Sequence, residues 1–176
     1  MGLTLLLGGA RSGKSALALR RARGTGRSLV FVATASAGDT EMAARIERHR
    51  KERVGTPWTT VEAPLDLRGA LEEAPAGACV VVDCLSLWVA NLLQSGEGEE
   101  EIAALAAKAG RLASSRPAPT IAVSNEVGMG VVPAYELGRR YRDALGRVNT
   151  LWAELAGEAA LVVAGRPLRL GGDDAG

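Results

Sequence analysis

The feature that most constrains this chain is a glycine-rich segment that follows an apolar run near its start. Leu3–Leu7 is apolar except at Thr4, and it leads directly into Gly8-Gly9-Ala10-Arg11-Ser12-Gly13-Lys14-Ser15. These eight residues match the pattern G-x-x-x-x-G-K-[S/T], placed between a strand and a helix. Glycines let backbone N–H groups converge on phosphate oxygens, and the following helix turns its positive dipole end to the same anion. The segment therefore predicts a phosphate-binding loop for a nucleoside triphosphate.

Two side chains of this loop have specific expected roles. The Lys14 ammonium is expected to neutralise the β- and γ-phosphate region, and the Ser15 hydroxyl can ligate Mg²⁺. The alternative is a glycine-rich turn that matches the pattern by accident, which the flanking strand and helix disfavour. The expected nucleotide-binding residues of the loop are Gly8, Gly9, Ala10, Arg11, Ser12, Gly13, Lys14 and Ser15.

Short apolar runs alternate with longer helical patterns along the chain, which is typical of βαβ units around a parallel sheet. Strands are expected at Leu3–Leu7, Leu29–Ala33, Ala78–Val82, Thr120–Val123 and Ala160–Val163, and Trp58–Glu62 is either a strand or a loop. Helices are expected at Lys14–Ala22, Thr40–Arg53, Leu65–Glu73, Leu85–Gln94, Glu99–Ser114 and Ala134–Ala156. The pattern predicts one α/β domain over residues 1–170, with helices on both faces of the sheet. The chain is expected to fray from Leu170, with a disordered tail at 171–176.

The composition argues against several classes of protein. Of the 176 residues 47% are hydrophobic, which is enough for the core of one domain. The 21 basic residues are balanced by 20 acidic ones and only 3% are aromatic, so no nucleic acid partner is expected. No membrane span is expected either, because no apolar stretch approaches the roughly 20 residues that cross a bilayer. We expect a cytoplasmic protein whose two cysteines, Cys79 and Cys84, are buried and reduced.

A carboxylate follows the most apolar of the expected strands. Cys79-Val80-Val81-Val82 is followed by Asp83, the position at which nucleotide-binding sheets hold Mg²⁺ or its water shell. The alternative is a polar residue that caps the helix expected at Leu85–Gln94, and the two roles are compatible. Asp83 and Ser15 are therefore the expected metal ligands.

His49 is the only histidine in the sequence, so any reaction that needs an imidazole must use this residue. On a helix, Arg45, His49 and Arg53 would share one face. A neutral imidazole is a good nucleophile towards phosphorus, and guanidinium groups beside it would stabilise phosphate charge. The alternative is a solvated, charged helix in which the histidine has no function, and the residues alone leave both open.

Several segments together resemble one family. They are Gly8–Ser15, Val32–Ala35, Met42–Arg50, Trp58–Glu62, Val82–Trp88 and Ser124–Pro133. The chain resembles the bifunctional adenosylcobinamide kinase / adenosylcobinamide-phosphate guanylyltransferases of cobalamin biosynthesis from Leu5 to about Val163. The runs Arg45-Ile46-Glu47-Arg48-His49 and Asn125–Gly130 are more specific to it than the phosphate loop is.

The resemblance implies two reactions, a P-loop fold of RecA type and a homotrimer. A nucleoside triphosphate, GTP or ATP, phosphorylates adenosylcobinamide; GTP then guanylylates the product through a covalent guanylyl-histidine, which releases pyrophosphate. By resemblance His49 is the nucleophile and the corrinoid is the partner, while Mg²⁺ is the metal expected from Ser15 and Asp83. The further nucleotide-binding positions implied are Ala33, Thr34, Ala35, Arg50, Lys51, Glu52, Arg53, Glu62 and Asp83.

The run Asn125–Gly130 follows an expected strand, at the edge where open α/β sheets bind ligands. Its glycines suit a loop that closes on substrate. Glu126 is a base for the kinase step, a second metal contact or a structural turn carboxylate. Two rival functions remain open from the residues: a simple P-loop kinase in which His49 is structural, and a RecA-like nucleic-acid-binding module or nucleotide switch.

Overall fold

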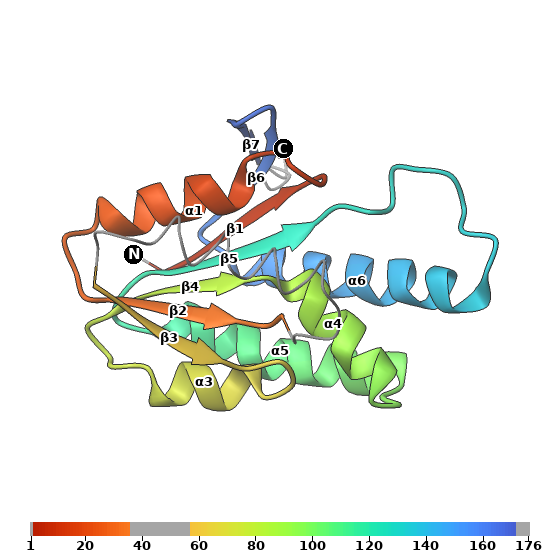
Figure 1. The fold of residues 1–176 in the computed structure, drawn as a ribbon, viewed down its shortest axis with the longest axis horizontal. Helices are drawn as coiled ribbons and strands as arrows, with labels where there is room; N and C mark the ends of the chain where they lie inside the picture. Colours follow the sequence, from red (N-terminus) through yellow and green to blue (C-terminus); the bar gives the residue numbers. More distant parts are fainter. Residues whose placement is uncertain (1, 36–56, 172–176) are drawn as a thin grey trace, which may run out of the picture.

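The computed structural model describes residues 2–35 and 57–171, and within them a single sheet is flanked by helices (Figure 1). The strands are β1 Leu3–Gly8, β2 Leu29–Ala33, β3 Trp58–Glu62, β4 Cys79–Asp83, β5 Thr120–Asn125, β6 Glu158–Val163 and β7 Arg166–Leu170. The helices are α1 Lys14–Arg23, α3 Leu67–Glu73, α4 Leu85–Gln94, α5 Glu99–Ser115 and α6 Glu136–Leu155.

The strands of the described residues form one sheet in the order β3-β2-β4-β5-β1-β6-β7. All neighbouring pairs are parallel except β6 with β7, which form an antiparallel hairpin. Strand β1 lies between β5 and β6, so the start of the chain pairs with segments near its end. Since the parallel strands point the same way, their carboxyl ends meet along one edge of the sheet.

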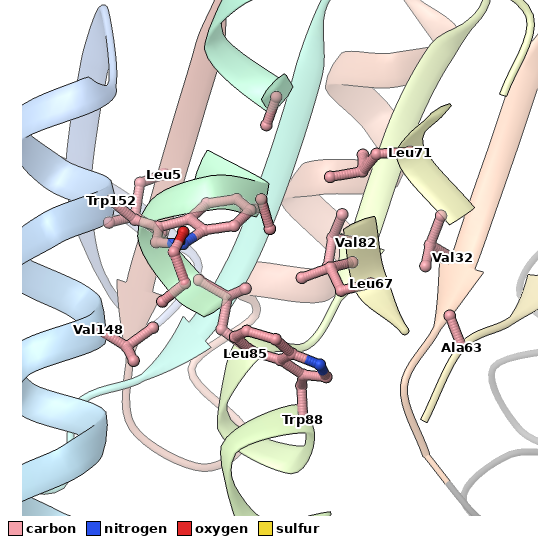
Figure 2. Close-up of a cluster of buried hydrophobic side chains, with 14 of the residues drawn as sticks. Leu5, Val32, Ala63, Leu67, Leu71, Val82, Leu85, Trp88, Val148 and Trp152 are labelled. Carbon is pink, nitrogen blue, oxygen red and sulfur yellow. The ribbon is translucent and has the colours of Figure 1, made fainter. Parts of the chain in front are cut away.

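Alternating side chains of the strands belong to two separate hydrophobic cores, because successive residues of a strand point to opposite faces of the sheet. Val81 of β4 packs with Leu17 and Ala18 of α1 on one face. Val80 and Val82 of the same strand face α3, α4, α5 and α6 on the other. This second core is closed by Trp88 of α4 and Trp152 of α6, both almost fully buried (Figure 2). The α/β architecture with helices on both faces is therefore confirmed.

Both buried tryptophans satisfy their indole N–H groups, as burial requires. Trp88 donates to the Leu65 carbonyl at 2.7 Å and Trp152 to the Ala106 carbonyl at 3.1 Å. Helices α5 and α6 approach closely at Gly110, where a Cβ would lie 2.8 Å from Leu155 Cδ1. Both cysteines are buried, as expected.

The five apolar strands expected from the sequence are all present, and Trp58–Glu62 is a strand, β3. Helix α3 begins two residues later than expected, at Leu67, because Asp66 caps it by accepting from the Gly69 N–H at 2.8 Å. Helix α6 begins at Glu136 rather than Ala134, since Tyr135 has extended backbone. The helix expected at Thr40–Arg53 and the end of the tail, 172–176, lie outside the described residues.

Strand β7 was not expected, and the fraying expected from Leu170 is wrong for that residue. Its sequence, Arg-Pro-Leu-Arg-Leu, has no continuous apolar run of the kind that marks a strand covered on both faces. In the structure all five residues are exposed. The strand exists because the two-residue turn at Ala164 and Gly165 folds it back onto β6.

Candidate functional site

The glycine-rich segment forms the loop between β1 and α1, at the carboxyl edge of the sheet. Gly13 caps α1 in the left-handed region, with φ of 91°, and Arg11 also has a positive φ of 57°. Glycine is required at position 13, since other side chains rarely adopt that conformation. The loop therefore delivers the N-terminus of a ten-residue helix to the sheet edge, where its N–H groups and dipole favour an anion.

Lys14 is the first residue of α1, and its side chain folds back over the loop. Its Nζ donates to the Gly9 carbonyl at 2.9 Å, and the residue is only 6% exposed. A buried ammonium held against the loop backbone brings positive charge to the place where a phosphate group would sit. The Ser15 hydroxyl follows at the next position of the helix, half-buried.

The carboxyl ends of three strands place sequence-distant candidate residues side by side. Ala33 of β2 pairs in register with Glu62 of β3 on one side and with Asp83 of β4 on the other. On the far side of β4, Gly8 at the start of the loop pairs with Asn125, the last residue of β5. The sheet thus gathers five residues from five strands along one edge.

Asp83 has a polar atom that its surroundings leave unsatisfied. Its Oδ2 is buried and has no hydrogen-bond partner within residues 2–35 and 57–171. A buried acceptor without a donor is costly unless something else binds it. Within the same ranges no three His, Cys, Asp or Glu side chains are grouped to hold a metal alone. Mg²⁺ in phosphate sites needs only one or two carboxylates, because phosphates and waters complete its shell, so Asp83 and Ser15 fit this metal.

Two further buried oxygens at the same edge lack partners in the described part of the chain: Ser12 Oγ and Asn125 Oδ1. The sequence placed Asn125 in the loop expected to close on substrate, but it did not assign it to the nucleotide or metal positions. Its position is fixed from α6, where Asn149 donates to the Asn125 carbonyl at 3.0 Å and accepts from Ser124 Oγ at 2.6 Å. The signal that could have identified it is a polar residue directly ending an apolar strand, as for Asp83.

Thr34 has a structural position at this edge. It is fully buried, and its hydroxyl donates to the Cys84 carbonyl at 2.7 Å and accepts from the Cys84 N–H at 2.8 Å. Asn91 of α4 donates to the Thr34 carbonyl at 2.8 Å. Thr34 therefore joins the end of β2 to the residue after Asp83, while its neighbours Ala33 and Ala35 are half-buried.

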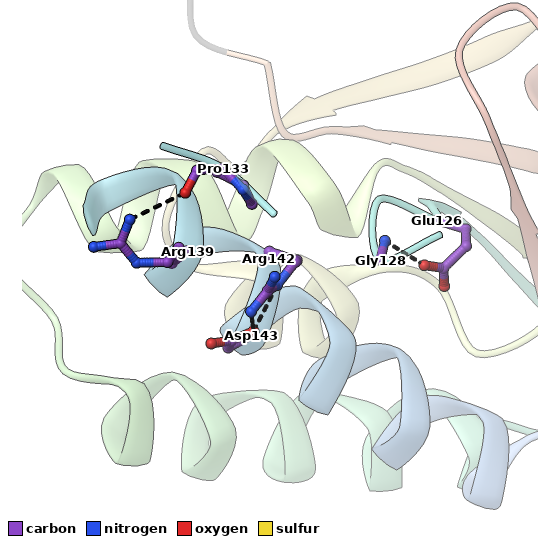
Figure 3. A network of polar contacts seen from close by, with 6 residues as sticks. All are labelled: Glu126, Gly128, Pro133, Arg139, Arg142 and Asp143. Atoms are coloured by element: carbon purple, nitrogen blue, oxygen red, sulfur yellow. Dashed lines mark hydrogen bonds and ion pairs between the residues drawn. The ribbon is translucent and has the colours of Figure 1, made fainter. Parts of the chain in front are cut away.

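Glu126 starts the segment between β5 and α6. Its backbone N–H donates to the Gly8 carbonyl at 3.2 Å, and its carboxylate accepts from the Gly128 N–H at 2.6 Å (Figure 3). Further along, Arg139 donates to the Pro133 carbonyl at 3.0 Å, which fixes the entry into α6 (Figure 3). In this structure the Glu126 carboxylate therefore stabilises the turn that follows β5.

Tyr141 of α6 contacts α4 behind the site. Its hydroxyl donates to the Ser86 carbonyl at 3.3 Å, and burial together with the nearby Cys84 raises the pKa of Tyr141 to about 12. The phenol is therefore neutral at physiological pH and acts as a hydrogen-bond donor.

The candidate residues His49, Arg50, Lys51, Glu52 and Arg53 lie outside the described residues.

A mostly parallel sheet, a glycine-rich loop between β1 and α1 and an acidic residue ending β4 define an α/β protein of the P-loop NTPase type. A solved protein from Pyrococcus horikoshii OT3 has a similar fold, with a TM-score of 0.57 over 96% of this chain and 85% of its own, at 8% identity.

The family is shown by sequence. The family model described as cobinamide kinase / cobinamide phosphate guanyltransferase matches residues 4–170. The bifunctional adenosylcobalamin biosynthesis protein CobP of Pseudomonas aeruginosa is 47% identical, over 96% of this chain and 97% of its own. The Escherichia coli bifunctional adenosylcobalamin biosynthesis protein CobU is 37% identical, over 93% and 96%. The chain belongs to this family of cobalamin-biosynthesis enzymes.

None of its described helices is long and apolar enough to cross a membrane.

Proposed function

We propose that this chain catalyses both reactions of its family on a corrinoid. A nucleoside triphosphate, GTP or ATP, phosphorylates the aminopropanol hydroxyl of adenosylcobinamide. GMP is then transferred from GTP to that phosphate, giving adenosylcobinamide-GDP and pyrophosphate. The observation that carries the proposal is the loop Gly8–Ser15 at the same edge of the sheet as Asp83, in a chain whose residues 4–170 match the family.

His49 is the nucleophile of the second reaction. A ring nitrogen attacks the α-phosphorus of GTP, forming a P–N bond while the bond to the pyrophosphate oxygen breaks. A phosphate oxygen of the corrinoid then attacks the same phosphorus and the P–N bond breaks, which restores the imidazole. Arg50, Lys51 and Arg53 are near His49 in sequence and supply positive charge for the nucleotide, and Glu52 belongs to the same proposed contact set.

The phosphate loop binds the leaving end of GTP in one reaction and the kinase donor in the other. Its N–H groups and Lys14 hold the β- and γ-phosphates, with Ser15 and Asp83 as the Mg²⁺ ligands. Mg²⁺, when bound, offsets the negative charge that develops on the phosphate oxygens. Ala33, Thr34, Ala35 and Glu62 line the remaining nucleotide positions, with Thr34 acting through the backbone it holds.

The corrinoid acceptor is large and partly apolar, and the segment after β5 supports a place for it. Met129, Val131 and Val132 are exposed there, and Val131 is 96% exposed. Exposed apolar side chains close to a binding edge mark a surface that a ligand or partner covers. We further propose a homotrimer, on the resemblance of the chain to its family, and a cytoplasmic location.

The guanylyl-histidine is tested by incubating the chain with GTP labelled at the α-phosphate. We expect a covalent label that is acid-labile and alkali-stable, and that is lost in His49→Ala. Adding adenosylcobinamide phosphate should discharge the label into adenosylcobinamide-GDP. Phosphorylation of adenosylcobinamide without any covalent label would instead indicate a simple P-loop kinase and would refute the histidine step.

A further inference from the structure

The last part of the described chain is a hairpin whose turn lies against the phosphate loop. Strands β6 and β7 pair antiparallel, with Val163 opposite Arg166, so the turn consists of only Ala164 and Gly165. Both have positive φ, 49° and 77°. Two consecutive residues in this region make the tight turn that matches the twist of a hairpin. The geometry therefore fixes where the Gly165 N–H points.

That N–H donates to the carbonyl of Ser12 at 2.7 Å, which joins the hairpin to the middle of the phosphate loop. The two backbones also pack closely. A Cβ on Gly13 would lie 3.0 Å from the Gly165 Cα, and one on Gly8 would lie 2.6 Å from the Val162 carbonyl oxygen. In Figure 1 the hairpin lies beside the end of β1, where the loop begins.

The direction of the Ser12 carbonyl matters for anion binding. A phosphate loop works by turning N–H groups toward the anion, and a carbonyl oxygen turned the same way would repel it. The bond to Gly165 N–H holds this carbonyl toward the hairpin. On the opposite side of the loop, the Glu126 N–H bonds the Gly8 carbonyl at 3.2 Å in the same manner. The loop is thus held between two segments that follow β5 and β6.

Core packing does not explain why the hairpin continues past Val162. Val163 is 60% exposed and every residue of β7 is exposed, so this segment buries little apolar surface. Its turn nevertheless contacts two residues of the loop. These contacts give the turn a means of holding the loop in place.

We propose that the Ala164–Gly165 turn is a positioning element for nucleotide binding: it holds the Ser12 carbonyl away from the phosphates and keeps the loop ready for a triphosphate. The proposal rests on the proposed function, since it assumes that the nucleotide binds at Gly8–Ser15. Gly165 is a positioning residue here, because it acts through Ser12 and Gly13.

The test compares two valine substitutions that impose the same backbone strain at different places. Gly165→Val forces a β-branched residue to φ of 77°, so the turn must shift and the bond to Ser12 is lost. Gly26→Val is the matched control, since Gly26 has φ of 66°, has nothing within 4 Å of an added Cβ, and lies in the turn after α1. Gly165→Asn is the conservative variant, because asparagine tolerates the left-handed region.

Equilibrium titration with a fluorescent GTP analogue and steady-state kinetics give the readouts. We expect Gly165→Val to weaken nucleotide binding at least about tenfold and to raise KM for the nucleotide but not for the corrinoid, because the hydrogen bond that orients the Ser12 carbonyl is lost. Gly26→Val and Gly165→Asn should bind within about twofold of the unaltered chain. Equal losses in Gly165→Val and Gly26→Val, or no loss in either, would overturn the proposal.

A second measurement uses the unaltered chain and does not depend on how the variants fold. Coupling between two sites is reciprocal, so bound nucleotide should slow amide hydrogen exchange in the β6–β7 turn but not in the turn at Gly26. Unchanged exchange at the hairpin, in a chain that binds nucleotide, would overturn the role of the turn alone. A chain that binds no nucleotide would overturn the proposed function and the role of the turn together.

Discussion

Asp83 shows how one residue can be fixed by its backbone and left open at its side chain. Its carbonyl accepts from the Thr34 N–H at 3.3 Å, and the Thr34 hydroxyl binds both backbone groups of the next residue, Cys84. The carboxylate Oδ2, in contrast, has no partner within the described ranges. A carboxylate carried on a backbone fixed in this way can bind a ligand with little reorganisation of the chain.

We expect Asp83→Asn to raise the Mg²⁺ concentration needed for half-maximal activity by about 10- to 100-fold, because an amide is a poorer metal ligand than a carboxylate. The backbone contacts of the residue remain, so the far-ultraviolet circular dichroism should not change. Asp143→Asn, at an exposed acid paired with Arg142 on α6, is the control and should leave the Mg²⁺ dependence unaltered. An unchanged Mg²⁺ dependence in Asp83→Asn would exclude this carboxylate as a metal ligand.

At the scale of elements, the residue after α5 ties together the chain between α3 and β4. Arg116 is 7% exposed, and its guanidinium donates to four carbonyls: Leu71 at 2.9 Å, Ala74 at 3.1 Å, Pro75 at 2.8 Å and Ala78 at 3.2 Å. Burial lowers the pKa of Arg116, and the nearby Cys79 partly opposes that shift. The arginine thus satisfies carbonyls at the end of α3 and in the turn before β4, beside the turn's own bond from the Ala78 N–H to the Pro75 carbonyl at 2.9 Å.

Arg116→Met should lower the free energy of unfolding by about 2–4 kcal/mol, since it leaves buried carbonyls without donors. Urea denaturation followed by circular dichroism measures the change. Arg111→Met, at an exposed position of α5, is the matched control and should stay within about 0.5 kcal/mol of the unaltered chain. Equal stability of the two variants would show that water replaces the guanidinium at little cost.

The sequence predicted where the strands lie in the chain better than it predicted which strands are neighbours in the sheet. Runs such as Leu29–Ala33 and Cys79–Asp83 identify buried parallel strands by their own residues. It could not predict that Ala33 lies between Glu62 and Asp83, because sheet order depends on contacts between distant segments. The sequence placed Asn125 at the start of the loop Asn125–Gly130, but it could not predict the pairing of Asn125 with Gly8. Strand β7 was missed because its exposed residues carry no apolar pattern.

At the scale of the whole molecule, the phosphate loop is linked to the stability of the entire domain. Its flanking elements, β1 and α1, contact both cores and the strands on either side. A ligand that binds only the folded chain stabilises all of it by mass action.

A triphosphate at 100 times its Kd should therefore add about 2.7 kcal/mol to the free energy of unfolding. For a domain of this size that corresponds to a rise in Tm of roughly 5–10 °C. Differential scanning fluorimetry measures the rise. Lys14→Ala should lose most of it relative to its own unliganded Tm, while Lys108→Ala, on α5, should keep it. A full rise in Lys14→Ala would place the nucleotide elsewhere.

The position of β1 between β5 and β6 also determines when the site can exist during protein synthesis. The ribosome makes the phosphate loop before it makes the two strands that pair with β1, Thr120–Asn125 and Glu158–Val163. The nascent chain therefore carries an apolar strand without its partners until β5 and β6 have been made, in contrast to domains that fold from their N-terminus onward. A truncated product that lacks β6 contains every loop residue and still has one side of that strand open.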